Sequence, residues 1–520
     1  MLLNVQPMHI DGLNCREDIF FTVAAHYKRE YQLAFSEAFN FKYTPAEPGQ
    51  SECMGGRIST GNENLQDLLE MYCGFKILTL KADTVDEIYK TIREQLQLGY
   101  PTAISINTYW CPWSRSYQKV NFGHTCLAID IDSENKITCL DPIAGQVHFY
   151  LPYEDFKNGF AYYSTFRFGM SRQNYDYREV LGTSVEKVFK YEIFNDMERF
   201  IEEFESQFNF DEEFKNGSAD IWGALLFRNL TYISGSRFLY SQFINYINKV
   251  LQNSKLEQVE KEFQCVHNKW KVVISWLLKG YYTGNSEGIH KRALKSFKDI
   301  LNMEKNILLN LQEAVQNDTI SVQKSAEILN VENISEDCEY TFIDLSNYFN
   351  SNAFHSTESG DCSADFTGTG HYFLSHNAPS GQIISLEKLK FRFPEIIDNR
   401  CNNISCDNQV ITVPSGEYKG ILLMGSSEWG NFIEQIGVNY IDGSSDSIQV
   451  NFSDWATESP LYDEIFIWGG KSHNKYEGRT YSNDYNLFAI QRLIPAKKDL
   501  ESITLPDCPN MHIFAATLYK

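Results

Sequence analysis

The sequence has no long hydrophobic run and no basic, apolar leader at its amino terminus. Its 520 residues contain no stretch of about 18 consecutive apolar residues, which a helix needs to cross a bilayer. The first residues lack the basic region followed by an apolar core that directs export. We therefore expect a cytoplasmic protein without a membrane-spanning segment.

Cysteine and clustered basic residues are also scarce. Twelve cysteines in 520 residues are too few for a disulfide framework, and no CxxC motif predicts a zinc or redox site. Cys401 and Cys406 form the closest pair, but without clustered histidines they are a weak metal signal, and we expect no metal. A formal net charge of −22 argues against nucleic acid as a partner, because phosphate contacts need clustered Lys and Arg.

The sequence does contain three regions of different pattern. Residues 1–170 alternate helical and strand patterns, residues 171–330 carry apolar stripes at helical spacing, and residues 338–520 hold short β-type runs between Gly, Ser, Asn and Asp. A chain of 520 residues is too long for one core, and domains of about 100–200 residues agree with three parts. We predict a multidomain α+β protein with a catalytic domain, a helical domain and a C-terminal antiparallel β-sandwich.

A cysteine stands at the predicted start of the first helix. Asp11-Gly12 breaks the chain before it, Asn14 is a favourable N-cap, and apolar residues recur at helical spacing after Cys15. The unpaired N–H groups of a helix start favour the thiolate, which is the nucleophilic form. Cys15 is therefore the candidate nucleophile, although this pattern alone favours the alternative of a half-buried structural cysteine.

A predicted hairpin supplies the partners that such a nucleophile needs. Two β-type runs over residues 122–132 and 137–141 flank a polar turn. Residues near the start of the first strand lie beside the end of the second, so His124 and Asp141 become neighbours. A carboxylate that orients an imidazole completes a cysteine triad. We predict the triad Cys15, His124 and Asp141, and we expect no comparable carboxylate beside the other histidines.

The order of these motifs resembles a known family. The motifs are Asn14-Cys15, Leu33-Ala-Phe-Ser-Glu37 followed by Phe41-Lys-Tyr43, Phe122-Gly-His124, Leu140-Asp-Pro142, Asp220-Ile-Trp-Gly, Phe227-Arg228, Ser236-Arg-Phe-Leu-Tyr240 and Lys269-Trp-Lys271. They resemble the butirosin biosynthesis protein H acyltransferases, which are related to papain-like and C39-type cysteine peptidases. The chain departs from that family at Asn14, where the family commonly has His, and after Glu37, where its glycine-rich stretch is poorly kept. The resemblance implies a papain-like catalytic domain over residues 1–170 and a helical domain over 171–330.

The resemblance also implies a reaction. Cys15 would attack an acyl, aminoacyl or peptidyl thioester on the phosphopantetheine arm of a carrier protein, with His124 taking the proton and Asp141 orienting it. The acyl group would pass to a small-molecule amine in non-ribosomal peptide or polyketide biosynthesis, with no further cofactor. A cysteine thioesterase, peptidase or amidase with the same triad and a non-catalytic carbohydrate-binding protein remain alternatives.

Two further features stay open at this point. An oxyanion hole needs a side-chain donor beside the Cys15 backbone N–H. Papain-like enzymes often place Gln six residues before the nucleophile, where this chain has His9, and the candidates are Asn14 and Gln6. In residues 338–520, motifs that begin at Asp344, Ala364, Tyr440 and Ser453 resemble galactose-binding-like sandwiches. Trp429 and Trp468 are candidates for stacking on a sugar, with ordinary packing as the alternative.

Overall fold

The computed structural model is a multidomain α+β structure with helices in the middle of the chain and a C-terminal β-sandwich region. It describes residues 2–46, 53–59, 64–82, 84–169, 175–190, 192–214, 223–283, 286–316, 338–358, 360–386, 388–457, 460 and 462–520. The chain divides into two compact units. Unit 1 is Met1–Phe208, Lys215–His267 and Leu301–Val322, and unit 2 is Asn209–Phe214, Asn268–Ile300 and Gln323–Lys520. The three-domain division of the sequence stays a prediction.

An antiparallel sheet forms the first part of unit 1, and its six described strands have the order β3-β8-β4-β5-β6-β7. Their bounds are β3 (Phe75–Leu80), β4 (Thr102–Asn107), β5 (Gly123–Ile131), β6 (Ile137–Asp141), β7 (Gln146–Leu151) and β8 (Phe160–Phe168). The predicted hairpin is confirmed as β5 and β6, which pair in antiparallel register around Leu127 and Leu140. The short strands β1 (Lys42–Tyr43) and β2 (Ile58–Ser59) pair separately.

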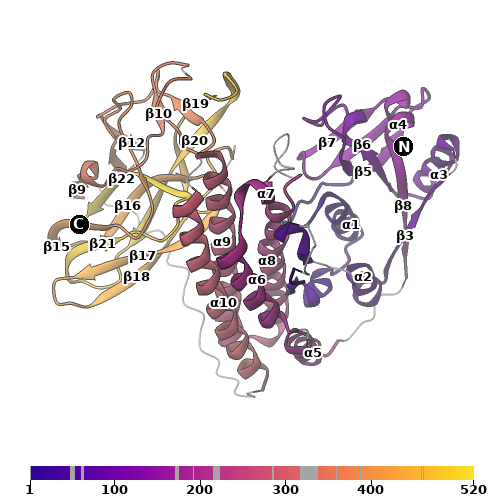
Figure 1. Ribbon diagram of the computed structural model, residues 1–520, viewed down its shortest axis with the longest axis horizontal. Helices are drawn as coiled ribbons and strands as arrows, with labels where there is room; N and C mark the ends of the chain where they lie inside the picture. The colour runs from indigo at the N-terminus through magenta and orange to yellow at the C-terminus, as the bar shows by residue number, and fades with distance from the viewer. Residues whose placement is uncertain are drawn as a thin grey trace. The chain divides into compact units, whose positions relative to one another are not determined.

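Helices cover both faces of this sheet (Figure 1). Helix α3 (Val85–Gln97) buries the predicted stripe of Ile88, Ile92 and Leu96 in one apolar cluster with Ile104 of β4 and Tyr163 of β8. Successive side chains of a strand alternate between faces, so Phe166 lies on the other face from Tyr163. On that face Phe20 of α1 (Cys15–His26) meets the Phe166 ring at a centroid distance of 6.4 Å. The buried face of α1 therefore fixes the direction of the helix that begins at Cys15.

The described part of residues 171–316 is largely helical. Smaller helical elements of the preceding region are η1 (Gln32–Glu37), η2 (Met54–Arg57), α2 (Leu65–Cys73), η3 (Thr108–Trp110) and α4 (Tyr153–Gly159). The helices that follow are α5 (Tyr177–Lys190), α6 (Ile193–Gln207), α7 (Phe210–Phe214), α8 (Leu225–Leu251), α9 (Ser254–Thr283) and α10 (Ser286–Gln316). The predicted stripe of α8 is buried at Phe243 and Ile247, but Val250 is 55% exposed because the stripe turns to solvent in the last turn. The motif that begins at Asp220 lies largely outside the described residues.

A fully buried ion pair lies among these helices in unit 1. Arg237 of α8 donates from Nε and Nη2 to the two carboxylate oxygens of Glu304 of α10, at 2.8 Å each. Its Nη1 donates to the carbonyl of Asn40 at 2.6 Å. Both charged side chains are 0% exposed. A buried guanidinium without these acceptors would carry a large desolvation cost. The packing of α8 therefore depends on α10 and on the chain at Asn40.

Unit 2 contains the β-sandwich. Its larger described sheet has the order β10-β11-β19-β20-β16-β22-β14 with β9 added on β22, and its smaller sheet has the order β15-β21-β17-β18. The bounds are β9 (Tyr340–Ile343), η6 (Ser346–Tyr348), β10 (Phe354–His355), β11 (His371–Leu374), β12 (Ile383–Leu386), β13 (Leu389–Arg392), β14 (Ile404–Ser405), β15 (Val410–Glu417), β16 (Gly420–Ser427), β17 (Phe432–Tyr440), β18 (Ser445–Phe452), β19 (Ile465–Asn474), β20 (Arg479–Leu493), β21 (Asp499–Thr504) and β22 (Met511–Tyr519). Apolar residues of the two sheets share one core, for example Leu423 of β16 and Ile436 of β17. The sandwich predicted for the C-terminal part is therefore confirmed.

Trp468, one of the two residues considered for sugar stacking, lies in an aromatic cluster of this unit. Its ring centroid is 5.5 Å from Phe354, 5.5 Å from Phe373 and 5.8 Å from Phe393. Trp429 is 38% exposed, and its indole N–H donates to the carbonyl of Thr367 at 3.0 Å. These contacts describe packing for Trp468, and sugar binding stays a prediction. Across the described ranges, no helix combines the length and the apolar character that crossing a membrane requires.

Candidate active site

The hairpin brings His124 and Asp141 into contact. His124 is the second residue of β5, and Asp141 is the last residue of β6. A register shift between Cys139 and Asp141, where β6 pairs with β7, marks a bulge at the end of the strand. The Nε2 atom of His124 lies 2.6 Å from Oδ2 of Asp141, and the Asp141 side chain is only 3% exposed. The carboxylate therefore holds one nitrogen of the imidazole in a fixed direction.

Cys15 begins α1 and faces the same imidazole. Asn14 caps the helix, because its Oδ1 accepts from the backbone N–H groups of Arg16 and Glu17 at 3.0 Å each. The Glu17 carboxylate accepts from the Asn14 N–H at 3.0 Å, which completes a capping box. Cys15 contributes to the raised pKa of His124, so the two side chains interact. Since Nε2 of His124 faces Asp141, Nδ1 is the nitrogen left for the sulfur.

The electrostatics of the site favour a charged imidazole. Burial lowers the pKa of His124, but the hydrogen bond to Asp141 and the interactions with the charges of Asp141 and Cys15 together outweigh burial and raise the pKa from 6.5 to about 10. Burial is the largest single influence and raises the pKa of Asp141, but the hydrogen bond and charge of His124, with the Trp113 and Ala144 N–H donors, together outweigh it and lower the net pKa. An imidazolium held by a carboxylate is the partner that stabilises a thiolate. The structure thus brings together the three residues of the predicted triad, whose catalytic role stays a prediction.

Trp113 is a further contact of the site that the sequence did not identify. Its indole Nε1 donates to Oδ2 of Asp141 at 2.8 Å, and its ring stacks on Phe149 at a centroid distance of 4.9 Å. The Oδ1 atom of Asp141 accepts from the backbone N–H of Ile143 at 3.2 Å. A signal for Trp113 existed, because its loop follows β4 and β4 pairs with the start of β5, where His124 lies.

Helix α8 supports the turn that precedes the nucleophile. Gly12 has a φ of +93°, and a Cβ added there would lie 2.4 Å from the Cα of Gly235 in α8. Tyr232 lies one turn earlier on α8. Burial raises the pKa of Tyr232, and an electrostatic interaction with Cys15 contributes to the rise. The site is therefore completed by a helix that follows the sheet in sequence, which no local pattern predicts.

A second imidazole and carboxylate pair joins the segment before α1 to the helix. Nδ1 of His9 is 2.6 Å from Oδ2 of Asp18, whose Oδ1 accepts from the Ile10 N–H at 3.1 Å. Asp18 is fully buried and stands three residues after Cys15, on the same side of the helix. The hydrogen bond to Asp18 raises the pKa of His9. The expectation that no other histidine has a carboxylate partner was wrong, because this pair forms across the Gly12 turn and not within a hairpin.

The two oxyanion candidates have other contacts. The Oδ1 atom of Asn14 caps α1, and the side-chain amide of Gln6 donates to Oδ1 of Asn4 at 3.0 Å in an exposed position. Their role as oxyanion donors stays a prediction. The twelve cysteines are free thiols, with Cys401 exposed and Cys406 buried. In the parts of the chain that the structure describes, no three His, Cys, Asp or Glu side chains gather as metal ligands would.

Comparison with known proteins identifies the class of the C-terminal part. Residues 339–520 match the family model of the AziU2-like beta-sandwich domain. This range contains the strands β9 to β22 of unit 2. A search of curated proteins gave no match to the chain. The protein therefore carries a C-terminal AziU2-like beta-sandwich domain.

Proposed function

We propose that the protein is a cysteine-dependent acyltransferase. The observation that carries the proposal is the contact of one imidazole with both partners. His124 lies 2.6 Å from Asp141 through Nε2, and Cys15 contributes to the raised pKa of the same imidazole. A thiol at a helix start, an imidazole and an orienting carboxylate are the groups that nucleophilic acyl transfer requires.

The first half of the reaction forms an acyl-enzyme. His124 takes the proton of the Cys15 thiol, and the thiolate attacks the carbonyl carbon of a thioester. The negative charge that develops on the carbonyl oxygen faces the start of α1, where the Cys15 N–H is not among the backbone donors that Asn14 satisfies. Asn14 and Gln6 remain the candidate side-chain donors. Collapse of the intermediate breaks the bond to the leaving sulfur, which takes the proton from His124.

The second half transfers the acyl group. An amine attacks the carbonyl of the acyl-enzyme, His124 accepts a proton from the amine nitrogen, and the Cys15 thiol is restored when it takes a proton from His124. The products are an amide and the free enzyme. Asp141 stays ionised throughout and stabilises the imidazolium. Trp113 fixes the carboxylate through its indole N–H.

The substrate class rests on the resemblance to butirosin-type acyltransferases. We propose an acyl, aminoacyl or peptidyl thioester on the phosphopantetheine arm of a carrier protein, a small-molecule amine as acceptor, and a place in non-ribosomal peptide or polyketide biosynthesis in the cytoplasm. The chemistry needs no cofactor beyond the arm of the carrier. A thioesterase would use the same residues with water as acceptor, so the identity of the acceptor separates the two activities.

The test is detection of the acyl-enzyme by intact mass. Wild-type protein is incubated with an acyl-pantetheine thioester, and we expect one acyl adduct that is absent in Cys15→Ala. Cys401→Ala is the matched control, because Cys401 is an exposed thiol. The adduct should persist in this variant. Absence of any adduct with acyl-pantetheine and with acyl-carrier protein, or an adduct that survives in Cys15→Ala, contradicts the proposal.

A second step identifies the acceptor. Amines are added to the acyl-enzyme, and formation of the amide is measured against release of the free acid. Amide formation supports the acyltransferase. Free acid as the sole product supports a thioesterase, and cleavage of peptides without reaction of thioesters supports a peptidase or amidase.

A further inference from the structure

Helix α8 presents one stripe of residues to the start of α1. Arg228, Tyr232 and Gly235 are separated by four and three residues, so they lie on one face of α8. Gly235 contacts Gly12 closely enough to exclude a side chain, which places this face beside the turn that precedes Cys15. Arg228 lies about 10 Å along the helix axis from that contact. It belongs to a sequence motif to which the triad chemistry assigns no role.

Tyr232 lies between Arg228 and Gly235 on this stripe and interacts with charged groups on both sides. Burial is the main cause of the raised pKa of Tyr232, while Arg228 lowers this pKa and Cys15 raises it. Arg228 and Cys15 therefore both act on the phenol group. Because its pKa is raised, Tyr232 keeps its proton at neutral pH, and its hydroxyl can donate a hydrogen bond.

Arg228 is a half-buried cation, and other arginines of unit 1 show how such a charge is usually held. The ion pairs are Arg57 with Glu203, Arg199 with Asp196 and Arg237 with Glu304. In the part of the chain that the structure describes, Arg228 forms no ion pair, and neither its guanidinium nor the Tyr232 hydroxyl forms a hydrogen bond. A guanidinium that has lost part of its hydration is stabilised by an anion. The position therefore suits a negatively charged group of a ligand.

The charged side chains that follow Cys15 in sequence have other contacts. Arg16 is held by the sheet, because its Nη2 donates to Oγ1 of Thr79 in β3 at 2.8 Å. Glu17 would repel an anion, but its carboxylate accepts from the Asn14 N–H at 3.0 Å in the capping box. Arg228 is thus the cation on the α8 side of the nucleophile that is best placed to receive an anion.

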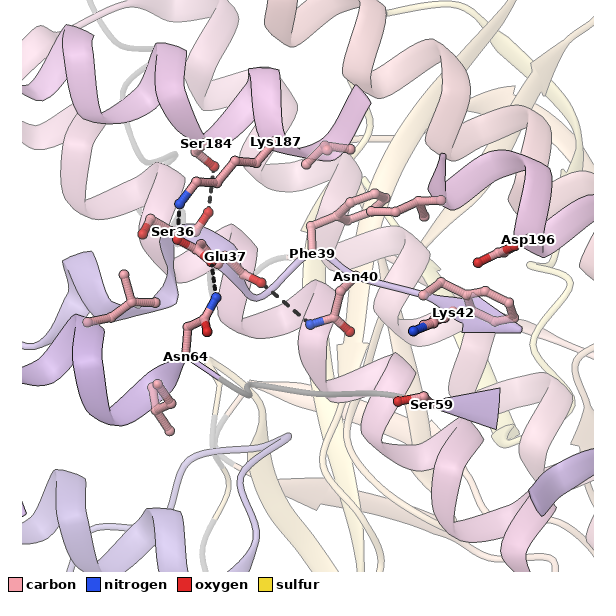
Figure 2. Close-up of a pocket in the computed structure, with 15 residues that line it drawn as sticks. Ser36, Glu37, Phe39, Asn40, Lys42, Ser59, Asn64, Ser184, Lys187 and Asp196 are labelled. Carbon is pink, nitrogen blue, oxygen red and sulfur yellow. Dashed lines mark hydrogen bonds and ion pairs between the residues drawn. The ribbon is translucent and has the colours of Figure 1, made fainter. Parts of the chain in front are cut away.

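The cavity in Figure 2 provides a comparison within unit 1. It has a volume of about 320 Å³, and its walls come from η1, from the chain around β1 and β2, and from α2, α5 and α6, so the α8 stripe is not part of it. Figure 2 shows the half-buried Lys187 beside Glu37, with which it forms an ion pair. Lys42 also lines the cavity, but it is exposed, so solvent can hydrate its ammonium. The charges of this cavity therefore do not require an anionic ligand.

We propose that Arg228 and Tyr232 bind an anionic group of the thioester donor, a phosphate or a carboxylate. The guanidinium donates two parallel N–H groups to two oxygens of the anion, and the phenol hydroxyl donates to the same group. The anion is the phosphate of the phosphopantetheine arm or a carboxylate at the end of the acyl group. This inference rests on the proposed acyl transfer and names the feature of the donor that the site selects. Binding of the anion involves no covalent step.

The test compares the rates at which three thioesters acylate Cys15, measured by intact mass. Butyryl-pantetheine is neutral, butyryl-4′-phosphopantetheine adds a phosphate to the arm, and glutaryl-pantetheine adds a carboxylate to the acyl group. In the wild type we expect one or both anionic donors to react faster than the neutral donor by about tenfold or more, and the faster donor identifies the source of the anion. In Arg228→Met this ratio of rates should fall toward one.

Equal rates for the three donors in the wild type, or an unchanged ratio in Arg228→Met, overturn this inference while the acyl adduct still supports the transferase. Arg228→Lys keeps the charge without the paired N–H groups and should retain only part of the ratio. Lys249→Met is the matched control, because Lys249 is an exposed residue in the last turn of α8 and the change also removes one positive charge. Its ratio should equal that of the wild type. Thermal unfolding midpoints check that the variants fold.

A second measurement needs no acylation. The Cys15→Ala protein and the Cys15→Ala, Arg228→Met double variant are titrated with the same three compounds by calorimetry. We expect an anionic compound to bind the single variant about tenfold or more tightly than the neutral one, and the double variant to lose this difference. Equal affinity of the two proteins for both anionic compounds, or no binding at millimolar concentration, overturns the inference even where no acyl-enzyme forms.

Discussion

Gly12 and Gly235 lie so close together that neither residue has room for a side chain. A Cβ added to Gly235 would lie 2.0 Å from the Cα of Gly12, and a Cβ added to Gly12 would lie 2.4 Å from the Cα of Gly235. Gly12 precedes the nucleophile by three residues. The backbone contact therefore ties the start of α1 to the middle of α8, and the position of the Cys15 sulfur depends on both.

Gly235→Ala tests this contact. The methyl group would push α8 away from the Gly12 turn, and we expect a loss of stability of about 1–3 kcal/mol, as for other overpacked sites. Labelling of Cys15 by iodoacetamide should change as well, because the sulfur moves relative to His124. Gly182→Ala in α5 is the control, since its Cβ meets only Val315 at an ordinary 3.8 Å. Thermal unfolding and mass-resolved labelling measure both effects, and equal behaviour of the two variants contradicts the expectation.

Asp141→Asn should change the pH dependence of stability. The pKa of His124 is raised from 6.5 to about 10, so its contribution to stability is complete below pH 6.5 and is lost as the pH rises toward 10. The pKa of Asp141 is lowered from 3.8, so its contribution is present above pH 3.8 and is lost as the pH falls. The free energy of unfolding of wild type minus that of the variant should therefore be largest between pH 3.8 and pH 6.5.

Urea unfolding between about pH 5 and pH 10 measures this difference. We expect it to shrink as the solution becomes alkaline, and a difference that grows with pH would contradict the assignment. Asp130→Asn is the control, because Asp130 lies in the same hairpin and its Oδ1 accepts from the neighbouring Ile131 N–H. The acylation rate of Cys15 should fall on the order of 10²-fold in Asp141→Asn and little in Asp130→Asn.

Trp113→Phe removes one donor from Asp141 and keeps an aromatic ring against Phe149. A hydrogen bond to a charged group contributes about 1.5–3 kcal/mol, so the acylation rate should fall by roughly tenfold to a hundredfold if the carboxylate loses its orientation. Trp110→Phe, in the same loop, is the control. Rates are measured by the acyl adduct on Cys15. The backbone N–H groups of Ile143 and Ala144 also donate to Asp141, at 3.2 Å and 3.5 Å. An unchanged rate in Trp113→Phe would show that these two donors are enough to orient the carboxylate.

The buried pair of Arg237 and Glu304 predicts a strong double-mutant effect. Loss of either partner leaves a charge without compensation in the interior, and we expect Arg237→Met or Glu304→Leu alone to cost about 3–5 kcal/mol. The double variant should recover part of that loss, because no charge remains buried. Denaturant unfolding of the four proteins measures the coupling. The control pair is Glu287→Gln and Lys291→Met, which are exposed and should have no measurable effect.

The sequence predicts the parts of the site that depend on local geometry. The β5–β6 hairpin follows from two apolar runs and a polar turn, and its antiparallel pairing places His124 near Asp141. Helix α3 follows from its spacing of apolar residues, and the start of α1 follows from Asn14 and the apolar residues after Cys15. In each case the decisive contacts lie within one element or between two elements joined by a short turn, so a short stretch of sequence determines them.

The remaining parts depend on contacts between distant segments. Tyr232 and Gly235 reach the site because α8 packs against the Gly12 turn, and no pattern around residue 12 contains that information. His9 contacts Asp18 because the turn at Gly12 folds the chain back onto α1. The spacing of the two residues in the sequence does not predict this turn geometry. Trp113 is an intermediate case. The pairing of β4 with β5 predicts that its loop lies close to His124, but it does not predict that the indole N–H points toward Asp141.

The buried pair between α8 and α10 also bears on when the site can form during synthesis. The ribosome makes the chain from its amino terminus, so Arg237 emerges 67 residues before the carboxylate that neutralises it. Until then its guanidinium cannot enter the interior without a large desolvation cost. Cys15 leaves the ribosome well before either of these residues, yet the packing that holds its helix is completed only after Glu304 has followed.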